Sequence, residues 1–171
     1  MTDIRAEELL DVLDERGRVV GRATRRACHS NPALMHQAVH VLVFDGQGRL
    51  WLQQRSCQKD IQPGRWDSSV GGHLRPGEAP EDGARREMRE ELGVEPSALQ
   101  FLYEYRWRSD VETEWVRTYR TRHAGPFQWP PEEIEAGRFW PVAEIEAGLG
   151  QGTFTPNFEF EFRTWKEHEA S

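Results

Sequence analysis

The chain has little cysteine and no long hydrophobic run. Cys28 and Cys57 are its two cysteines among 171 residues, and their spacing fits neither a CxxC redox motif nor a zinc site. We expect buried free thiols and therefore a reducing, cytoplasmic compartment. The first residues are acidic where a signal peptide would be hydrophobic, and no stretch reaches the roughly 20 apolar residues of a membrane helix. Composition therefore argues against secretion and membrane insertion.

An excess of basic residues is also missing. The 22 Lys and Arg are outnumbered by 29 Asp and Glu, which gives a net charge of −7. Nucleic acids and anionic membranes are bound through basic faces, so we expect neither as a partner. A small anionic ligand remains compatible with this balance if a few cations converge locally. Nothing in the sequence indicates the oligomeric state.

Internal repeats and low-complexity linkers are absent, so residues 1–171 are predicted to form one domain. Residues 1–35 read as an N-terminal extension, with a hairpin over residues 10–20 and a short helix that Thr24 caps. Apolar alternation predicts a second hairpin over residues 38–55. The remaining expected elements are a Gly/Pro-rich loop at 61–77, helices at 79–92 and 156–168, and strands at 99–108, 114–123 and 139–142. Together they predict an α/β fold with a mixed β-sheet between helices.

The expected helix at 79–92 carries an unusual group of carboxylates. Glu87, Glu90 and Glu91 stand at positions i, i+3 and i+4, so their side chains project from one side. Like charges at that spacing repel one another, and the arrangement is understandable if a cation binds among them. Mg²⁺ prefers oxygen ligands and often completes its coordination with substrate phosphates. The spacing therefore indicates metal-assisted chemistry on a phosphate ester or anhydride.

The surrounding residues match a known motif. Residues 72–94 contain Gly72-x5-Glu78-x7-Arg86-Glu87-x-x-Glu90-Glu91-x-Gly93. This pattern resembles the complete Nudix box, with Met88 as a mild departure at an apolar position. The resemblance implies the Nudix α/β/α sandwich and cleavage of a nucleoside diphosphate, or another organic diphosphate, linked to a further group X.

The resemblance also assigns roles to residues of the motif. Glu87, Glu90 and Glu91, with the backbone carbonyl of Gly72, correspond to the ligands of Mg²⁺ or Mn²⁺. Arg86 would orient Glu90, and Glu78 would reach back from its loop to hold Arg86. Either Glu90 or Glu91 would accept the proton of the attacking water.

A second resemblance covers residues 24–123. His36-x-Ala38, the run Leu52-Gln53-Gln54-Arg55-Ser56-x-x-Lys59, Pro63-Gly64-x-Trp66 and Gly72-His73 are similar to the isopentenyl-diphosphate isomerase branch of the superfamily. In that branch three His and two Glu bind a metal, and the matching positions here are His29, His36, His73, Glu112 and Glu114. His40 and His123 match nothing and are expected at the surface or in a strand. The isomerase cysteine is replaced by Gly71, which favours hydrolysis.

Arg55 and Lys59 resemble the cations that hold a diphosphate, with Arg65 and Arg75 as weaker candidates. Trp66 could stack on a base, and core packing is the alternative for it and for the other aromatic candidates Trp107, Trp115, Tyr103 and Tyr105. We therefore expect a metal-dependent pyrophosphohydrolase of nucleoside 5′-di- or triphosphates. An isomerase-like enzyme and a non-catalytic nucleotide-binding Nudix module are the alternatives.

Overall fold

The computed structural model describes residues 4–59 and 61–171. In chain order the elements are η1 (Ile4–Glu7), β1 (Leu9–Leu13), β2 (Val19–Thr24), α1 (Arg25–Cys28), β3 (Met35–Phe44), β4 (Leu50–Arg55), β5 (Trp66–Asp67), β6 (Val70–His73), α2 (Pro80–Leu92), β7 (Gln100–Arg108), β8 (Thr113–Arg122), β9 (Ile134–Trp140), α3 (Val142–Gly148) and α4 (Pro156–Glu169). Residues 1–3, with which the expected N-terminal extension begins, lie outside the described residues.

Strand β3 is the centre of the sheet. It runs parallel to β8 and antiparallel to β1, β4 and β6. Because β6 pairs with Ala38–Val41 whereas β4 joins β3 at Phe44, the sheet branches there, and β4 continues into β5 and β9. Parallel and antiparallel pairs thus occur in one sheet, as the sequence predicted.

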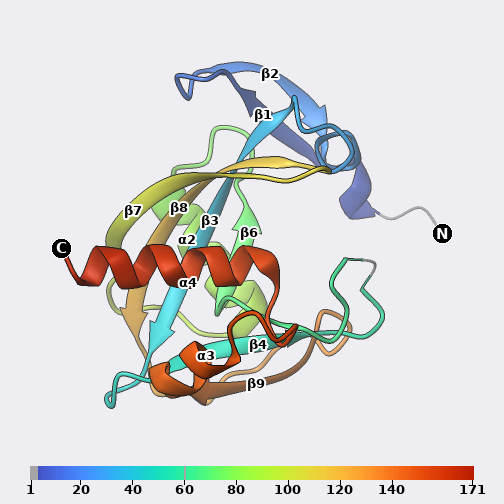
Figure 1. Cartoon of the computed structure of the whole chain (residues 1–171). Coiled ribbons are helices and arrows are strands. Elements are labelled where there is room, and N and C mark those ends of the chain that lie inside the picture. Colours follow the sequence, from blue (N-terminus) through green and yellow to red (C-terminus); the bar gives the residue numbers. More distant parts are fainter. Residues whose placement is uncertain (1–3, 60) are drawn as a thin grey trace.

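Helices cover both faces of this sheet, and α4 crosses one face while α2 lies on the other (Figure 1). The side chains of β3 contribute to the hydrophobic cores on both faces of the sheet, since successive side chains of a strand point to opposite faces. Val39, Val41 and Val43 pack with α2, while Leu42 packs with α4. The helices contribute apolar stripes to these cores, made of Ala84, Met88 and Leu92 on α2 and of Phe158, Phe162 and Trp165 on α4. The expected α/β/α arrangement is confirmed.

The two long helices begin and end where their sequences predict. Pro80 occupies the first turn of α2, and Gly93 ends that helix in the left-handed conformation with a φ of 68°. The Thr155 side chain accepts a hydrogen bond from the Phe158 backbone N–H and so caps α4. Thr24 caps the short helix α1 in the same manner.

Two local expectations are wrong, and one helix was not predicted. The segment 61–77, predicted as a loop because it is rich in Gly and Pro, contains the short strands β5 and β6. The strand predicted at 139–142 begins earlier, at Ile134, and ends at Trp140. Helix α3, which was not predicted, follows it directly; it begins after Pro141 and has no side-chain cap.

The N-terminal hairpin β1–β2 is joined to the rest of the fold by polar contacts. The Asp11 carboxylate accepts a hydrogen bond from the backbone N–H of Gly77, 3.0 Å away, in the loop that precedes α2. At the hairpin tip the Glu15 carboxylate pairs with Arg106 and Arg108 of β7. The hairpin therefore supports both the outer strand β7 and the loop before the acidic helix.

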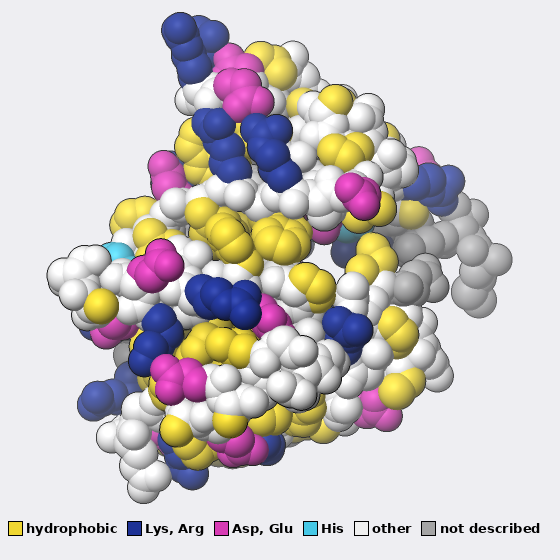
Figure 2. Space-filling view, viewed as in Figure 1, with side chains coloured by type: hydrophobic (Ala, Val, Ile, Leu, Met, Phe, Trp, Pro, Cys, Tyr) yellow, Lys and Arg dark blue, Asp and Glu magenta, His cyan; other side chains and the backbone are white. Residues whose placement is uncertain are grey.

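The surface of the described residues carries both signs of charge. Figure 2 shows basic and acidic side chains interspersed with hydrophobic ones on the face that α4 covers, without a continuous basic area in that view. None of the described helices is both long enough and apolar enough to cross a membrane.

Candidate active site

Helix α2 places its carboxylates against strand β6. The Glu87 carboxylate fills the space beside Gly72, where an added Cβ would lie 2.1 Å from the Glu87 Cδ atom. Any larger residue at position 72 would displace this side chain, which explains why a glycine stands there. Burial raises the pKa of Glu87, although the Arg86 guanidinium opposes the shift. We call Glu87, Glu90 and Glu91, together with Arg86, the helix cluster.

Arg86 is the cation of the helix cluster. Its guanidinium forms a bidentate pair with Glu78, with nitrogen–oxygen distances of 2.8 and 2.9 Å. It also donates to Glu87 at 2.7 Å, to Glu90 at 3.3 Å and to the backbone carbonyl of His73 at 3.0 Å. The hydrogen bonds from Arg86 lower the pKa of Glu78. The expected reach of Glu78 back to Arg86 is therefore observed, and one guanidinium fixes three carboxylates.

Glu91 and Glu90 differ in their surroundings. The Glu91 carboxylate accepts hydrogen bonds from the side-chain amide of Gln53 at 3.0 Å and from the backbone N–H of Gly71 at 3.1 Å. Burial, followed by the negative charge of Glu87, raises the pKa of Glu91 to about 8. The Glu90 side chain is half exposed, and Arg75 lies 3.5 Å from its carboxylate. Glu90 is thus the most accessible carboxylate of the three.

Next to the helix cluster lies a second group, which we call the histidine cluster. Its members come from α1, β3, β6 and β8 or the turns beside them: His29, His36, His73, Glu112 and Glu114. Register brings several together, because β3 pairs His36 with Glu114 and Ala38 with His73. One ligand atom from each of His29, His36, His73 and Glu112 lies within 4.8 Å of the others. The structure therefore brings together all five residues that the isomerase resemblance selected.

The charges of the histidine cluster are strongly perturbed. Burial and the neighbouring charge of Glu114 raise the pKa of Glu112 to about 7. Burial also lowers the pKa of His29 to about 4, with a contribution from His73. The pKa of Glu114 is well below its usual range, because its interactions with His36 and His73 outweigh its burial. Glu112 Oε2 and His36 Nε2 are buried and make no hydrogen bond with the described residues, although Glu112 Oε2 lies 3.3 Å from His29 Nε2 and His36 Nε2 lies 3.6 Å from Glu114 Oε1.

The expected diphosphate-binding cations are engaged with protein groups. Lys59 pairs with the Glu133 carboxylate. The guanidinium of Arg55 donates to the backbone carbonyl of Ile61 at 3.0 Å and lies 3.5 Å from Asp67. Each would have to exchange or share these contacts to bind a phosphate.

The aromatic candidates mainly pack against other protein groups. Trp66 packs edge-on against Trp140, with ring centroids 5.2 Å apart. Trp115 lies against Gly17 in the hairpin tip, and Trp107 contacts Phe160 of α4. The alternative of structural packing accounts for these three contacts.

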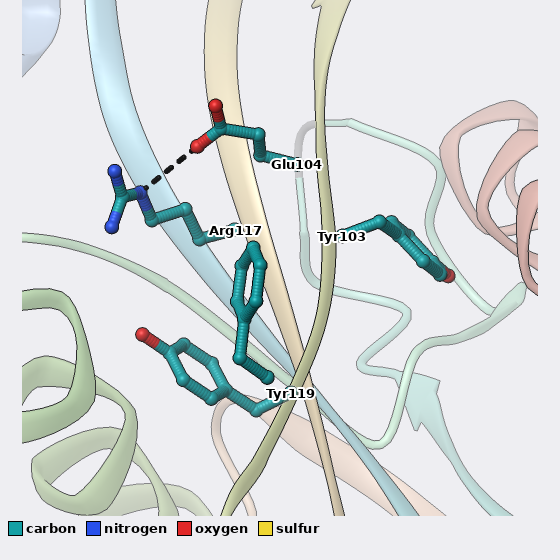
Figure 3. A pocket seen from close by; sticks show the side chains of 5 residues that line it. Tyr103, Glu104, Arg117 and Tyr119 are labelled. Atoms are coloured by element: carbon teal, nitrogen blue, oxygen red, sulfur yellow. Dashed lines mark ion pairs between the residues drawn. The ribbon is translucent and has the colours of Figure 1, made fainter.

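The candidate tyrosines Tyr103 and Tyr105 lie on the α4 side of the sheet, whereas Tyr119 packs on the α2 side. A cavity of about 410 Å³ on strands β7 and β8 is lined by Phe101, Tyr103, Glu104, Arg117 and Tyr119. Figure 3 shows Tyr103 pointing away from the other labelled residues, toward α4, while Glu104 and Arg117 form an ion pair. Tyr103 and Tyr105 both donate hydrogen bonds to Glu161 of α4. This cavity contains no residue of the helix cluster or the histidine cluster.

Of the two positions that the sequence left open for His40, the strand is observed: it lies in β3, is 6% exposed, and its Nδ1 lies 2.7 Å from a Glu161 carboxylate oxygen. Its partner stands 121 residues later in the chain, so no local pattern could reveal the pair. Cys57, expected to be buried, is exposed and hydrogen-bonds Glu135, whereas Cys28 is buried and free as predicted.

Comparison with known proteins agrees with this geometry. Residues 34–158 match the NUDIX domain family. The chain is 36% identical over 156 residues to an uncharacterised Nudix hydrolase, SCO1686 of Streptomyces coelicolor, covering 89% of this chain and 84% of that protein. It is 45% identical over 156 residues to an isopentenyl-diphosphate Delta-isomerase of Streptomyces griseus, covering 88% of this chain and 79% of the relative.

The fold has a similar solved structure in DR0079 from Deinococcus radiodurans, with a TM-score of 0.78 and 28% identity, covering 92% of this chain and 98% of that one. The chain therefore belongs to the Nudix family. It is an enzyme of the Nudix hydrolase class, which acts on acid anhydrides of phosphorus.

Proposed function

We propose that this protein hydrolyses a phosphoanhydride bond of nucleoside 5′-di- or triphosphates, including nucleoside diphosphates linked to a group X. Water is the attacking group. The carboxylates of Glu87, Glu90 and Glu91, with the backbone carbonyl of Gly72, would hold Mg²⁺ or Mn²⁺. A bound ion of this kind polarises phosphoryl oxygens, offsets negative charge and activates water.

The observation that carries this proposal is the burial of two neighbouring carboxylates against the main chain of β6. Glu87 lies beside Gly72, and Glu91 accepts the N–H of Gly71. Burial raises the pKa of both side chains, and the charge of Glu87 adds to the effect on Glu91. A divalent cation among oxygen donors would relieve this repulsion, so the donor set fits a hard cation.

The remaining roles follow from access and contacts. Glu90 is our first choice to accept the proton of the attacking water, because it is the most exposed of the three, with Glu91 as the alternative. Arg86, held by Glu78, would keep Glu87 and Glu90 in position through the reaction. Arg55 and Lys59 stay proposed as diphosphate contacts.

Trp66 is proposed to contact the base of the nucleotide. Its ring lies beside Trp140 and 5.8 Å from the Arg138 guanidinium carbon, and it is half-buried. The exposed part of the ring could stack on a planar group, because every nucleobase presents a π-face.

We also propose that the histidine cluster holds a second divalent ion. Imidazole and carboxylate donors together suit Mn²⁺, Zn²⁺ or Fe²⁺. The proposal is supported by the two buried atoms without partners, His36 Nε2 and Glu112 Oε2, because such atoms are rare without an ion or a water. Hydrolysis at the helix cluster does not route through this ion.

The test is a panel of nucleoside diphosphates, triphosphates and X-linked diphosphates, assayed with Mg²⁺ and with Mn²⁺. Mass analysis of the products identifies the broken bond. Metal-dependent release of a phosphate or a nucleoside monophosphate is the expected result. Turnover confined to isoprenoid or sugar diphosphates would refute the nucleotide assignment.

Isomerisation of an allylic diphosphate is the second candidate, because a relative that is 45% identical carries the name isopentenyl-diphosphate Delta-isomerase and the histidine cluster fits that branch. Gly71 offers no proton-transferring side chain at the position that the resemblance gives to a thiol. Cys28 is buried in the hairpin core, and Cys57 lies beside Glu135. Incubation of isopentenyl diphosphate in D₂O distinguishes the two candidates: deuterium incorporation supports the isomerase and its absence supports the hydrolase.

A further inference from the structure

A buried ionic network lies between helix α4 and the sheet. Glu161 is 0% exposed and accepts hydrogen bonds from His40 Nδ1 at 2.7 Å and from Thr118 Oγ1 at 3.0 Å. The hydroxyl groups of Tyr103 and Tyr105 donate to the same carboxylate. A buried carboxylate persists when it is paired and fully hydrogen-bonded. These contacts therefore fix the plane of the His40 ring and the direction of its second nitrogen.

That second nitrogen, His40 Nε2, is free of protein partners. Within residues 4–59 and 61–171 no group hydrogen-bonds it, although only 8% of the side chain is exposed. The edge of the ring faces Gly71, where an added Cβ would lie 3.4 Å from Nε2 and 3.2 Å from Cδ2. Gly71 itself is exposed. The imidazole is therefore held by Glu161 through Nδ1, and its Nε2 lies beside the exposed main chain of Gly71.

The exposed main chain lies between the two candidate metal sites. The Gly71 N–H donates to Glu91 of the helix cluster, and His73 of the histidine cluster follows two residues later on β6. The carboxylates of Glu114 and Asp67 also act on the charge of His40. A glycine inside a strand often marks a place where a ligand approaches the backbone closely. The main chain of Gly71 therefore contacts Glu91, which comes from α2 on one side of the sheet, and lies beside the His40 ring on the α4 side.

We propose that His40 is a substrate-binding residue whose Nε2–H donates a hydrogen bond to an oxygen of the diphosphate, with Glu161 as its positioning residue. This inference rests on the proposed hydrolase function. The geometry resembles the general arrangement in which a carboxylate orients an imidazole through Nδ1 and leaves Nε2 to face the reactants. A ligand oxygen could therefore accept a hydrogen bond from Nε2 without breaking any contact between His40 and Glu161.

The charge of the pair agrees with this role. Burial alone would lower the pKa of His40, but the hydrogen bond and negative charge of Glu161 raise it to about 9. At neutral pH the ring then carries a proton on each nitrogen and donates from both. A hydrogen bond from a charged donor to a phosphate oxygen is stronger than one between neutral groups.

Two substitutions at position 40 separate binding from stability. The amide of His40→Asn reaches the place of Nδ1, so it can still donate to Glu161 while the donor over Gly71 is lost. The amide of His40→Gln reaches the place of Nε2 and gives up the contact with Glu161. Thr118→Val is the matched control, because it removes a donor from the same carboxylate on the buried side.

Three readouts apply to all variants: kcat/KM for the best nucleotide of the panel, the calorimetric Kd of methylenediphosphonate with Mg²⁺, and the thermal midpoint. We expect His40→Asn to lower kcat/KM and to weaken diphosphonate binding, each about 10-fold or more, with a smaller loss of midpoint than His40→Gln. His40→Gln should recover part of the binding and lose more stability. Thr118→Val should lose stability with kcat/KM within about twofold of wild type.

The outcomes separate the two proposals. Wild-type kcat/KM and diphosphonate affinity in His40→Asn would overturn the substrate contact while leaving hydrolysis intact. Diphosphonate binding that weakens in His40→Asn, in a protein that hydrolyses no nucleotide, would support the contact and reject the proposed function. Absence of both hydrolysis and diphosphonate binding in the wild type would overturn both.

Discussion

The helix cluster packs against Gly71 and Gly72 of β6, and the histidine cluster includes the next residue, His73, yet the charges of the two clusters are balanced in different ways. In the helix cluster Arg86 contacts three carboxylates and Glu91 accepts two protein hydrogen bonds. In the histidine cluster the cationic candidates are the imidazoles themselves, and two buried atoms have no hydrogen-bond partner among the described residues.

The difference indicates separate uses for the two clusters. A charge network completed by an arginine can fold without an ion and can bind and release one with each substrate. A cluster with unsatisfied buried atoms gains more from permanent occupancy, because an ion that binds the folded state stabilises it. We therefore expect substitutions in the helix cluster to act on turnover, and those in the histidine cluster to act on bound metal and stability.

The largest effect is expected from Glu90→Gln. Its half-exposed side chain can be replaced without disturbing the core, but the proposed metal ligand and proton acceptor is lost. We expect kcat to fall roughly 100- to 1,000-fold, the scale seen when one electrostatic group is removed from an active site. Steady-state kinetics with Mg²⁺ measure it. Glu81→Gln, an exposed position on the same helix, is the control and should keep wild-type turnover.

Arg86→Lys tests the network that completes the helix cluster. A lysine cannot reproduce the bidentate pair with Glu78 and the contact with Glu87 at the same time. We expect kcat to fall about 10- to 100-fold, the usual effect of losing a group that orients metal ligands. Arg89→Lys, whose ion pair with Glu95 is exposed, provides the comparison. If Arg86→Lys and Arg89→Lys have the same kcat, the hydrogen bonds of Arg86 have no role in catalysis.

The His40–Glu161 pair lies outside both clusters and gives a pH signature. The pKa of His40 is raised to about 9, so its contribution to stability is present below pH 6.5 and is lost as pH rises through 9. Glu161 has a lowered pKa, and its contribution is lost as pH falls below its ordinary value of 4.5. Urea unfolding from pH 6.5 to 9.5 should show a loss of roughly 1–3 kcal/mol that His40→Asn lacks. Parallel curves for the two proteins would contradict the assignment.

The smallest effect on turnover is expected from His29→Asn. Because hydrolysis is assigned to the helix cluster, kcat should change only a few-fold. The protein should retain about one metal ion fewer after dialysis, since the substitution removes a ligand atom from the histidine cluster. Elemental analysis measures this loss, and His168→Asn, at an exposed position near the end of α4, is the control. A loss of turnover as severe as that of Glu90→Gln would make the histidine cluster the reactive one.

Much of the fold could be predicted because its signals are local. The bounds of α2 follow from Pro80, the apolar stripe and Gly93, all within one short segment. Strand β6 was missed, because Val70, Gly71, Gly72 and His73 show no apolar alternation and gain their strand geometry by pairing with β3. The short helix α3 was missed because it directly follows β9 and lacks a capping side chain.

In the site, too, the residues that could be predicted are those whose signals are local in the sequence. Glu78, Arg86 and the three carboxylates lie within one motif, so spacing located them. The pairing of His40 with Glu161, and that of Lys59 with Glu133, depends on segments 121 and 74 residues apart. Only the folded chain brings such residues together, and for that reason their protein partners could not be predicted.

The central claim is that Glu87, Glu90 and Glu91 gather divalent ions where water attacks a phosphoanhydride. Anomalous diffraction from crystals soaked in Mn²⁺ with a non-hydrolysable nucleotide tests it most directly. The account predicts manganese beside these carboxylates and the Gly72 carbonyl, in contact with the phosphates. Manganese confined to the histidine cluster, with nucleotide bound and no ion at the helix carboxylates, would contradict it.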